Sequence, residues 1–225
     1  MGFLLDNLDV IVEGFAVTLQ LLATAGIIAA VAGTLLACVR VSPVPPLRGV
    51  GTAYVNVFRN TPLLLVLLIM AFGLPEVGVS LQIDVGPLQY SNFETYASLG
   101  LGLYTAAFVC EALRSGINSV SSGQAEAARA VGMSFGQTLR LVVLPQAARS
   151  VVAPMASIYI ALAKNTSVAL GAGVAEATYE MRKLLNDNAT ERLVIFIGFA
   201  LGYIAIVAVI SLVANVLERR LVVLR

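Results

Sequence analysis

Five long stretches of mostly apolar residues alternate with shorter polar segments along the chain. They cover roughly residues 15–39, 54–74, 96–114, 137–163 and 193–217. A helix that crosses a bilayer needs about 20 mostly apolar residues, so each stretch is long enough for one crossing. The pattern predicts an all-α integral membrane protein, with one transmembrane domain over residues 1–225 and about five transmembrane helices.

The polar segment at residues 118–136, between the third and fourth stretches, carries the signals of two helix starts. Ser121 with Gln124, and Ser134 with Gln137, each have the spacing of a capping box, which satisfies free N–H groups at a helix start. Gly132 stands where the first helix should end and suits the left-handed conformation of a C′ residue. We therefore expect two short helices joined by a sharp turn.

The same segment contains a longer spaced pattern. Its members are Glu126, Ala127, Ala128, Gly132, Val142, Leu144 and Pro145. This pattern resembles the EAA loop of ABC importer permeases, although that family has an isoleucine where Val142 stands. The resemblance implies the type I ABC importer permease fold, with a cytoplasmic coupling helix that docks into a groove on an ATPase. It assigns contacts with the ATPase to Glu126, Ala127, Ala128, Arg129 and Gly132.

The residues of this segment also have a simpler interpretation. Glu126 and Arg129 are three apart on one helix face, close enough to pair. An alanine-rich amphipathic cytoplasmic helix without a partner would have the same features.

The second apolar stretch is interrupted by a polar phrase that ends in Pro62. Pro62 removes a backbone donor, and Thr61 is suited to cap a restarted helix. Asn60 and Thr61 would then lie about 10 Å inside the cytoplasmic end. They predict either a wall of a permeation path, since polar groups within spans usually face a cavity, or a proline kink beside a snorkelling Arg59.

A second polar phrase, Lys164 to Ser167, follows the fourth stretch and precedes a glycine-containing break. Lys164, Asn165, Thr166 and Ser167 are costly to place against lipid, which favours a position along a path. The alternative is a lysine that snorkels to the outer surface. Near the inner end of the third stretch, Glu111 and Arg114 predict an ion pair, with a substrate contact by Glu111 as the alternative.

Two segments are expected on the outer side. Residues 75–95 carry Glu76, Asp84 and Glu94 without Lys or Arg, as expected of an external loop. Residues 174–187 form an apolar helical stripe opposite charged residues, which indicates an amphipathic surface helix. The stripe contains Val174, Ala177, Met181, Leu184 and Leu185, and the opposite face contains Glu176, Glu180 and Lys183.

Composition narrows the function classes. The 225 residues are 59% hydrophobic and 12% charged, which excludes an ordinary soluble domain. The net charge of +1 and the lack of a basic block argue against nucleic-acid binding. The chain has no histidine, and Cys38 and Cys110 lie in apolar stretches, where packing is expected rather than a disulfide. Acidic residues near the start argue against a signal peptide.

The basic residues predict the orientation of the chain in the membrane. With the N-terminus outside, five spans place ten arginines on the inner side: Arg40, Arg48, Arg59, Arg114, Arg129, Arg140, Arg149, Arg219, Arg220 and Arg225. The outer segments contain only Arg182, Lys183 and Arg192. This bias favours a cytoplasmic C-terminus and also puts residues 118–136 in the cytoplasm.

Five phrases extend the resemblance over nearly the whole chain. They are RVSPVPPLR (40–48), FRNTPL (58–63), EALRSGINSV (111–120), GQAEAAR (123–129) and KNTS (164–167). They resemble permeases of polar amino-acid importers, and among these the glutamate-uptake permeases of prokaryotic cytoplasmic membranes. The resemblance implies a second permease subunit, ABC ATPase subunits that bind ATP and magnesium, and an extracytoplasmic substrate-binding protein. The chain itself has no phosphate-binding GxxxxGK[ST] motif, so we expect no ATP hydrolysis and no cofactor in it.

An amino acid in a low-dielectric passage requires groups that match its carboxylate and ammonium. The expected lining of the path is Asn60, Thr61, Glu111, Lys164, Asn165, Thr166 and Ser167. An ion-coupled secondary transporter or channel is the main alternative, because interrupted helices also suit that class. A membrane enzyme or assembly scaffold is the weaker alternative, since no catalytic pair occurs at a diagnostic spacing.

Overall fold

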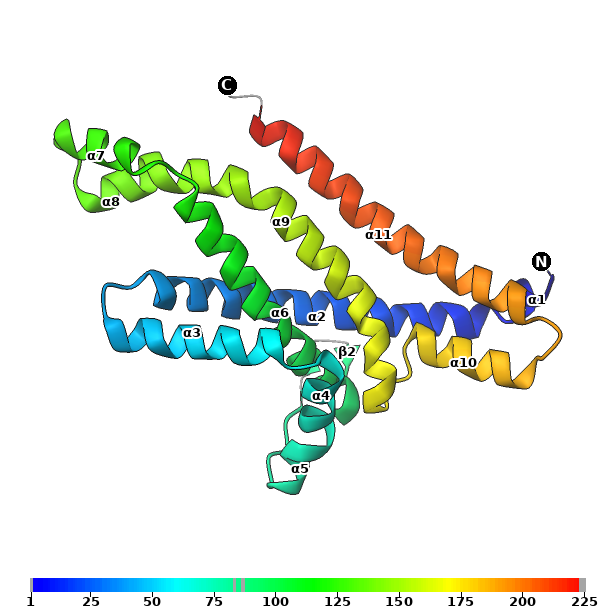
Figure 1. Cartoon of the computed structure of the whole chain (residues 1–225). Coiled ribbons are helices and arrows are strands. Elements are labelled where there is room, and N and C mark those ends of the chain that lie inside the picture. Colours follow the sequence, from blue (N-terminus) through cyan, green and yellow to red (C-terminus); the bar gives the residue numbers. More distant parts are fainter. Residues whose placement is uncertain (1, 83, 86–87, 223–225) are drawn as a thin grey trace.

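The computed structural model describes residues 2–82, 84–85 and 88–222 and is almost entirely helical (Figure 1). Arg225, assigned above to the inner side, lies outside these residues. The long helices are α2 (Leu8–Val41), α3 (Pro45–Asn60), α6 (Asn92–Asn118), α9 (Leu144–Asn165) and α11 (Arg192–Val222). The shorter helices are α1 (Gly2–Asp6), α4 (Leu63–Leu68), α5 (Leu74–Glu76), α7 (Ser122–Ala130), α8 (Phe135–Thr138) and α10 (Ala177–Asp187). There are also two π-helical turns, η1 (Ile69–Gly73) and η2 (Leu139–Val143), and a 3₁₀ segment, η3 (Thr166–Ala172). Two short strands, β1 (Asp84–Val85) and β2 (Leu88–Gln89), form an antiparallel hairpin.

Among the described residues, four helical segments are long and apolar enough to cross a membrane. They lie at residues 8–41, 92–118, 135–172 and 192–220. A fifth crossing results if the bent pair α3 and α4–α5 is counted as one span. The chain is therefore a multi-pass membrane protein.

The second predicted span is broken rather than merely kinked. The helix axes on the two sides of Thr61–Pro62 differ by 106°. The sequence predicted that Thr61 caps the restarted helix, and this prediction is wrong. Its hydroxyl donates a 2.7 Å hydrogen bond back to the Val57 carbonyl, and Pro62 occupies the cap position of α4 without a side-chain bond. Thr61 thus satisfies an orphan carbonyl of α3 instead.

The third span, α6, is the centre of the molecule and packs against α2, α3, α4 and α9. Small residues permit the close approach of α2 and α6. A methyl group at Gly102 would lie 2.6 Å from Ile28 Cγ2, and one at Gly33 would lie 2.6 Å from Val109 Cβ. Side-chain bulk at either glycine would separate α2 from α6.

The amphipathic helix α10 packs against α2 and α11. Its predicted stripe is confirmed, since Ala177 and Leu184 are buried together with Ile195 and Phe199 of α11. The prediction for Glu176 is wrong: it is fully buried rather than on the charged face. As the N-cap residue of α10, its carboxylate accepts backbone N–H groups from Thr178 and Tyr179 and the hydroxyl of Tyr203, so these bonds offset its burial.

The arrangement has two distinct ends (Figure 1). The α7–α8 elbow and the α2–α3 turn lie at the left, with the C-terminal end of α11 above them, whereas α5 lies at the bottom and α10 at the right. The chain turns back after α2, which ends at Val41, and α3 starts at Pro45. Cys38 and Cys110 are both free thiols, but the expected packing holds only for Cys110, which is buried, whereas Cys38 is exposed.

Candidate functional site

The sharp turn between α7 and α8 has the predicted geometry. Gly132 has a φ of +89°, in the left-handed region. Its N–H bonds the Arg129 carbonyl at 3.0 Å, and the Met133 N–H bonds the Ala128 carbonyl at 3.1 Å. These two bonds form a Schellman motif, which ends α7 and turns the chain sharply. The elbow is therefore a defined structure rather than an irregular loop.

One of the two predicted capping boxes is present. Ser134 and Gln137 exchange hydrogen bonds of 2.8 and 3.3 Å at the start of α8. Ser121 and Gln124 do not, and that prediction is wrong. The Gln124 side chain instead reaches Gln146 at the start of α9, and Gln146 also donates to the Val142 carbonyl at 2.9 Å. The first turn of α7 is consequently tied to α9.

The five residues assigned to ATPase coupling are all in this elbow, but they do not face the same way. Glu126, Ala127, Arg129 and Gly132 are exposed. Ala128 is buried and anchors α7 to the rest of the molecule. Among the ion pairs of the described residues, none joins Glu126 to Arg129. Both charges are therefore available to a partner.

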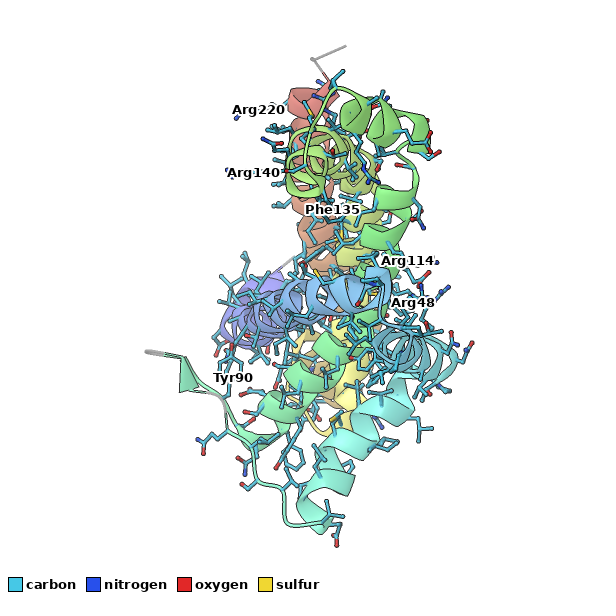
Figure 2. The ribbon with its side chains drawn as sticks, turned by 90° about the vertical axis from the view of Figure 1, so that its left-hand side faces the viewer. Arg48, Tyr90, Arg114, Phe135, Arg140 and Arg220 are labelled. Atoms are coloured by element: carbon cyan, nitrogen blue, oxygen red, sulfur yellow. The ribbon has the colours of Figure 1, made fainter. Side chains whose placement is uncertain are left out.

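Two apolar residues of the elbow were missed by the sequence analysis. Val131 is 77% exposed and Phe135 is 76% exposed, on either side of Gly132. Figure 2 shows Phe135 in the upper part of the molecule, within the α8 region. The sequence does contain a signal for them: two large apolar side chains in an otherwise polar turn. Such side chains indicate a contact surface when they are exposed together.

A second polar centre is built around Glu111 of α6. Its predicted ion pair with Arg114 is confirmed, at 3.3 Å. The same carboxylate also contacts Arg40 at the end of α2 and lies 3.8 Å from Arg59 at the end of α3. One carboxylate thus joins three guanidinium groups from three helices, which leaves an excess of positive charge. The sequence placed these arginines on the inner side without bringing them to Glu111.

A cavity of about 320 Å³ lies between α6 and α9, beside this centre. It is lined by Tyr104, Thr105 and Phe108 of α6 and by Ser157, Ile158, Ala161, Leu162 and Asn165 of α9. The Arg59 guanidinium lies 5.8 Å from the centre of the Phe108 ring, within range of a cation–π contact. Hydroxyl and amide groups therefore line the cavity, and a half-exposed cation lies next to its Phe108 wall.

Of the other predicted path residues, only Asn165 lines this cavity, and the rest differ in exposure. Lys164 is exposed, and among the described residues it takes part in no ion pair. Ser167 donates to the Lys164 carbonyl at 2.6 Å, and Thr166 is buried with its hydroxyl on the Ala163 carbonyl. Asn60 and Thr61 are turned back onto carbonyls of α3, and neither lines the cavity of Asn165.

The two centres have different chemistry. The elbow offers a protruding helix with free charges and apolar side chains, which suits binding to another protein. The Glu111 centre and its neighbouring cavity offer cations, hydroxyl groups and an amide, which suit a small zwitterionic or anionic molecule. Within the described part of the chain, no group of three or more Asp, Glu or Cys side chains is placed to hold a metal ion.

Comparison with known sequences places the chain in a wider context. Residues 23–223 match the family described as binding-protein-dependent transport system inner membrane component. The chain is 42% identical to the glutamate transport system permease protein GluC of Corynebacterium glutamicum, over 95% of this chain and 94% of that protein. It is 36% identical to the glutamate/aspartate import permease protein GltJ of Escherichia coli K12, over 92% and 85%.

A solved structure shows the same architecture. The chain resembles a crystal structure of an amino acid ABC transporter with histidines, with a TM-score of 0.83 and 26% identity. The match covers 96% of both chains. The order and packing of the helices are therefore those of the type I ABC importer permease fold.

Proposed function

The chain belongs to the family of binding-protein-dependent transport system inner membrane components, and we propose that it is the permease subunit of an ATP-driven amino-acid importer. The observation that carries this proposal is the α7–Gly132–α8 elbow, a rigid protrusion at the end of the molecule that also carries the α2–α3 turn. The names of the relatives favour glutamate or a similar polar amino acid as substrate. The subunit would provide part of the path and transmit the ATPase cycle to it.

ABC ATPase subunits are the partners of the elbow in this proposal. Glu126, Ala127, Arg129 and Gly132 form its exposed surface, and Val131 and Phe135 add apolar contact area. Helix α7 would be the coupling helix. Polar rims around an apolar centre are typical of protein interfaces. ATP and magnesium would be bound by the partner, and this subunit would only transmit movement.

The arginines support an orientation with the elbow in the cytoplasm. Arginines lie in the elbow (Arg129) and beside the α2–α3 turn (Arg40 and Arg48), which are on the same side of the molecule in Figure 1, and Arg219 and Arg220 lie in the last turn of α11. Lysine and arginine are enriched on the cytoplasmic side of membrane proteins. The N-terminus and α10 would then face outward, where a substrate-binding protein would deliver the amino acid.

A second permease subunit would complete the path. In the single chain, α6 is largely buried, whereas few residues in the apolar parts of α9 and α11 are fully buried. The cavity beside Asn165 is also partly open. Either a copy of this chain or a related permease would cover these surfaces, apart from those that face lipid.

The path itself is proposed to follow the α6–α9 cavity. A substrate carboxylate would be attracted by Lys164, the neighbour of the lining residue Asn165, and by Arg59 beside Phe108, and Asn165, Ser157 and Tyr104 would supply hydrogen bonds. Charged groups in a low-dielectric site must be matched to offset the loss of hydration. Glu111 would act indirectly, by holding Arg59 near the cavity.

The test is transport in proteoliposomes that contain the purified permease with its copurifying ATPase and the binding protein. We expect uptake of radiolabelled glutamate to require ATP and to persist when ionophores dissipate the ion gradients. Uptake that stops with the ionophores and ignores ATP would support an ion-coupled transporter instead. Lys164→Met, which keeps length but removes charge, should slow glutamate uptake without loss of ATPase binding. Wild-type uptake kinetics in this variant would mean that Lys164 lies outside the path.

A further inference from the structure

An apolar groove with a volume of about 830 Å³ lies between α2, α9 and α11. Leu22 and Ile27 of α2, Met155 and Tyr159 of α9, and Val209 and Val213 of α11 are among its walls. The Tyr159 hydroxyl donates to the Gly26 carbonyl at 3.0 Å, so it is already satisfied. The described lining thus has no free hydrogen-bonding side chain for an amino acid, and hydrocarbon is the matching occupant.

The depth of the groove corresponds to one bilayer leaflet. Its lining runs from Val151 to Tyr159 on α9 and from Val209 to Leu217 on α11. Each segment is about 12 Å of helix. Half of a hydrocarbon core is about 15 Å thick. The groove therefore has the length of an acyl chain within one leaflet rather than that of a full crossing.

The mouth of the groove is basic. Arg149 is three residues before Val152 and seven before Ala156, on the groove-lining stripe of α9. Arg220 is seven residues after Val213 on the lining stripe of α11. Neither arginine takes part in an ion pair with another described residue.

Other charges near this mouth are also mostly positive. Figure 2 shows Arg220 extending outward at the top of the molecule. Arg219 adds a further cation, and Glu218 is the acidic residue next to it. The inner mouth is therefore a net positive rim around hydrocarbon walls.

We propose that this groove binds an anionic phospholipid of the cytoplasmic leaflet, with an acyl chain between α9 and α11 and the phosphate between Arg149 and Arg220. The inference rests on the orientation given under Proposed function, which puts these arginines on the cytoplasmic side. Basic pockets between transmembrane helices on that side suit acidic lipid headgroups. The lipid would pack between the inner parts of α9 and α11 that line the groove.

A second copy of the chain is the competing occupant, and two features disfavour it. A two-fold interface brings a patch against itself, so the basic rims would repel each other. Transmembrane helix pairs prefer small residues at their contact, whereas the α11 wall consists mainly of Val209, Ile210, Val213 and Leu217.

The proposal can be tested on the purified transporter by native mass spectrometry. After detergent exchange, the complex is incubated with phosphatidylglycerol or with phosphatidylcholine of the same acyl chains, and retained lipid is counted. We expect preferential retention of phosphatidylglycerol. Arg149→Gln and Arg220→Gln should each reduce it about five-fold, whereas Arg182→Gln, an exposed arginine of α10, should not. Subunit stoichiometry in the same spectra shows whether each variant assembles.

A second pair of variants tests the hydrocarbon part of the site. Ala156→Phe fills the groove and should reduce retention of both lipids, whereas Ala205→Phe, on an exposed part of α11 outside the lining, should not. Equal retention of both lipids that no variant changes would overturn the proposal. So would a disulfide between Met155→Cys residues of two copies, in a background without the native cysteines. Lipid counting requires no transport, so its result is separate from that of the uptake assay.

Discussion

The side chain of Gln124 in α7 meets that of Gln146 in α9, so the elbow is tied directly to the fourth membrane helix. Gln146 lies just after the π-helical turn η2 and Pro145, where the helix lacks a backbone donor. A force on α7 thus reaches α9 where its backbone is least regular. We therefore expect the two glutamines to act as positioning residues for coupling.

Replacing Gln146 by Leu should weaken coupling a few-fold, because a hydrogen bond of this kind contributes about 0.5–1.5 kcal/mol. The measurement is the number of substrate molecules taken up per ATP hydrolysed. Gln124→Leu should have a similar or smaller effect, because Gln146→Leu also loses the bond to the Val142 carbonyl. The double variant should be no worse than Gln146→Leu alone, since both changes remove the same contact between the glutamines. Additive losses would mean that the two side chains act separately.

Gly132→Val should abolish coupling while leaving membrane insertion intact. A methyl group at Gly132 has no heavy atom within 4 Å, so the variant is not obstructed by packing. Its cost is that of a β-branched residue at a φ of +89°, about 1–3 kcal/mol. Copurification of the ATPase and substrate-stimulated ATP hydrolysis are the readouts.

The matched control is Gly136→Val, because Gly136 also has open space around it but lies in α8 at an ordinary φ. Gly132→Asn should retain more function than Gly132→Val, since Asn tolerates the left-handed region. Normal coupling in a well-expressed Gly132→Val protein would contradict the role of the elbow.

Local signals predicted most of the helices and the Gly132 turn, because they depend on residues a few positions apart. The capping box at Ser134 and the stripe of α10 are of this kind. Glu176 shows where this reasoning fails. Helical periodicity placed it on the charged face, but it precedes α10 as the N-cap, where the side chain follows cap geometry.

Contacts between distant segments were beyond the sequence analysis. Pro62 signalled a break, but the 106° angle depends on how α3 and α4 pack against α6. In the same way, Arg40 and Arg59 reach Glu111 only because α2, α3 and α6 converge. The spacing of Ser121 and Gln124 predicted a capping box, but in the structure the Gln124 side chain bonds Gln146 of α9 instead.

The buried Glu176 predicts a pH dependence of stability. Burial is the main cause that raises the pKa of Glu176 above 4.5, against the opposing effect of its hydrogen bonds. A carboxyl group whose pKa is higher in the folded than in the unfolded protein stabilises the fold when it is protonated. This stabilisation is complete below the unfolded-state pKa and is lost as pH rises through the folded-state pKa. The melting temperature should therefore rise as pH falls from 7 to 4.5, and Glu176→Gln should make this rise smaller.

The matched variant for this position is Glu176→Ala. It removes the acceptor for the N–H groups of Thr178 and Tyr179 and should cost about 1–2 kcal/mol at all pH values. Glu176→Gln keeps an acceptor oxygen and should be less harmful at pH 7. A pH profile that is the same in wild type and Glu176→Gln would assign the dependence to other groups.

Orientation can be checked with single cysteines in a chain where Cys38 and Cys110 are replaced, since Cys38 is exposed and would react. Ser122→Cys, at the start of α7, should be labelled by a membrane-impermeant maleimide only from the cytoplasmic side. Val79→Cys, beyond α5, should be labelled only from outside. Both sites are exposed in the structure. Labelling of the two from the same side would exclude the proposed arrangement of spans.

The Glu111 centre predicts that removing the anion is worse than removing a cation. Glu111→Gln leaves three arginines together without a counter-charge, which should destabilise the protein by about 2–3 kcal/mol, given that the carboxylate is one-quarter exposed. Arg114→Gln should cost less, because Glu111 keeps Arg40 and Arg59. If repulsion is the cause, adding Arg59→Gln to Glu111→Gln should restore part of the lost stability. The measurement is thermal unfolding of wild type, the two single variants and the double variant in one detergent. A double variant less stable than Glu111→Gln alone would show that Arg59 stabilises the fold independently of Glu111.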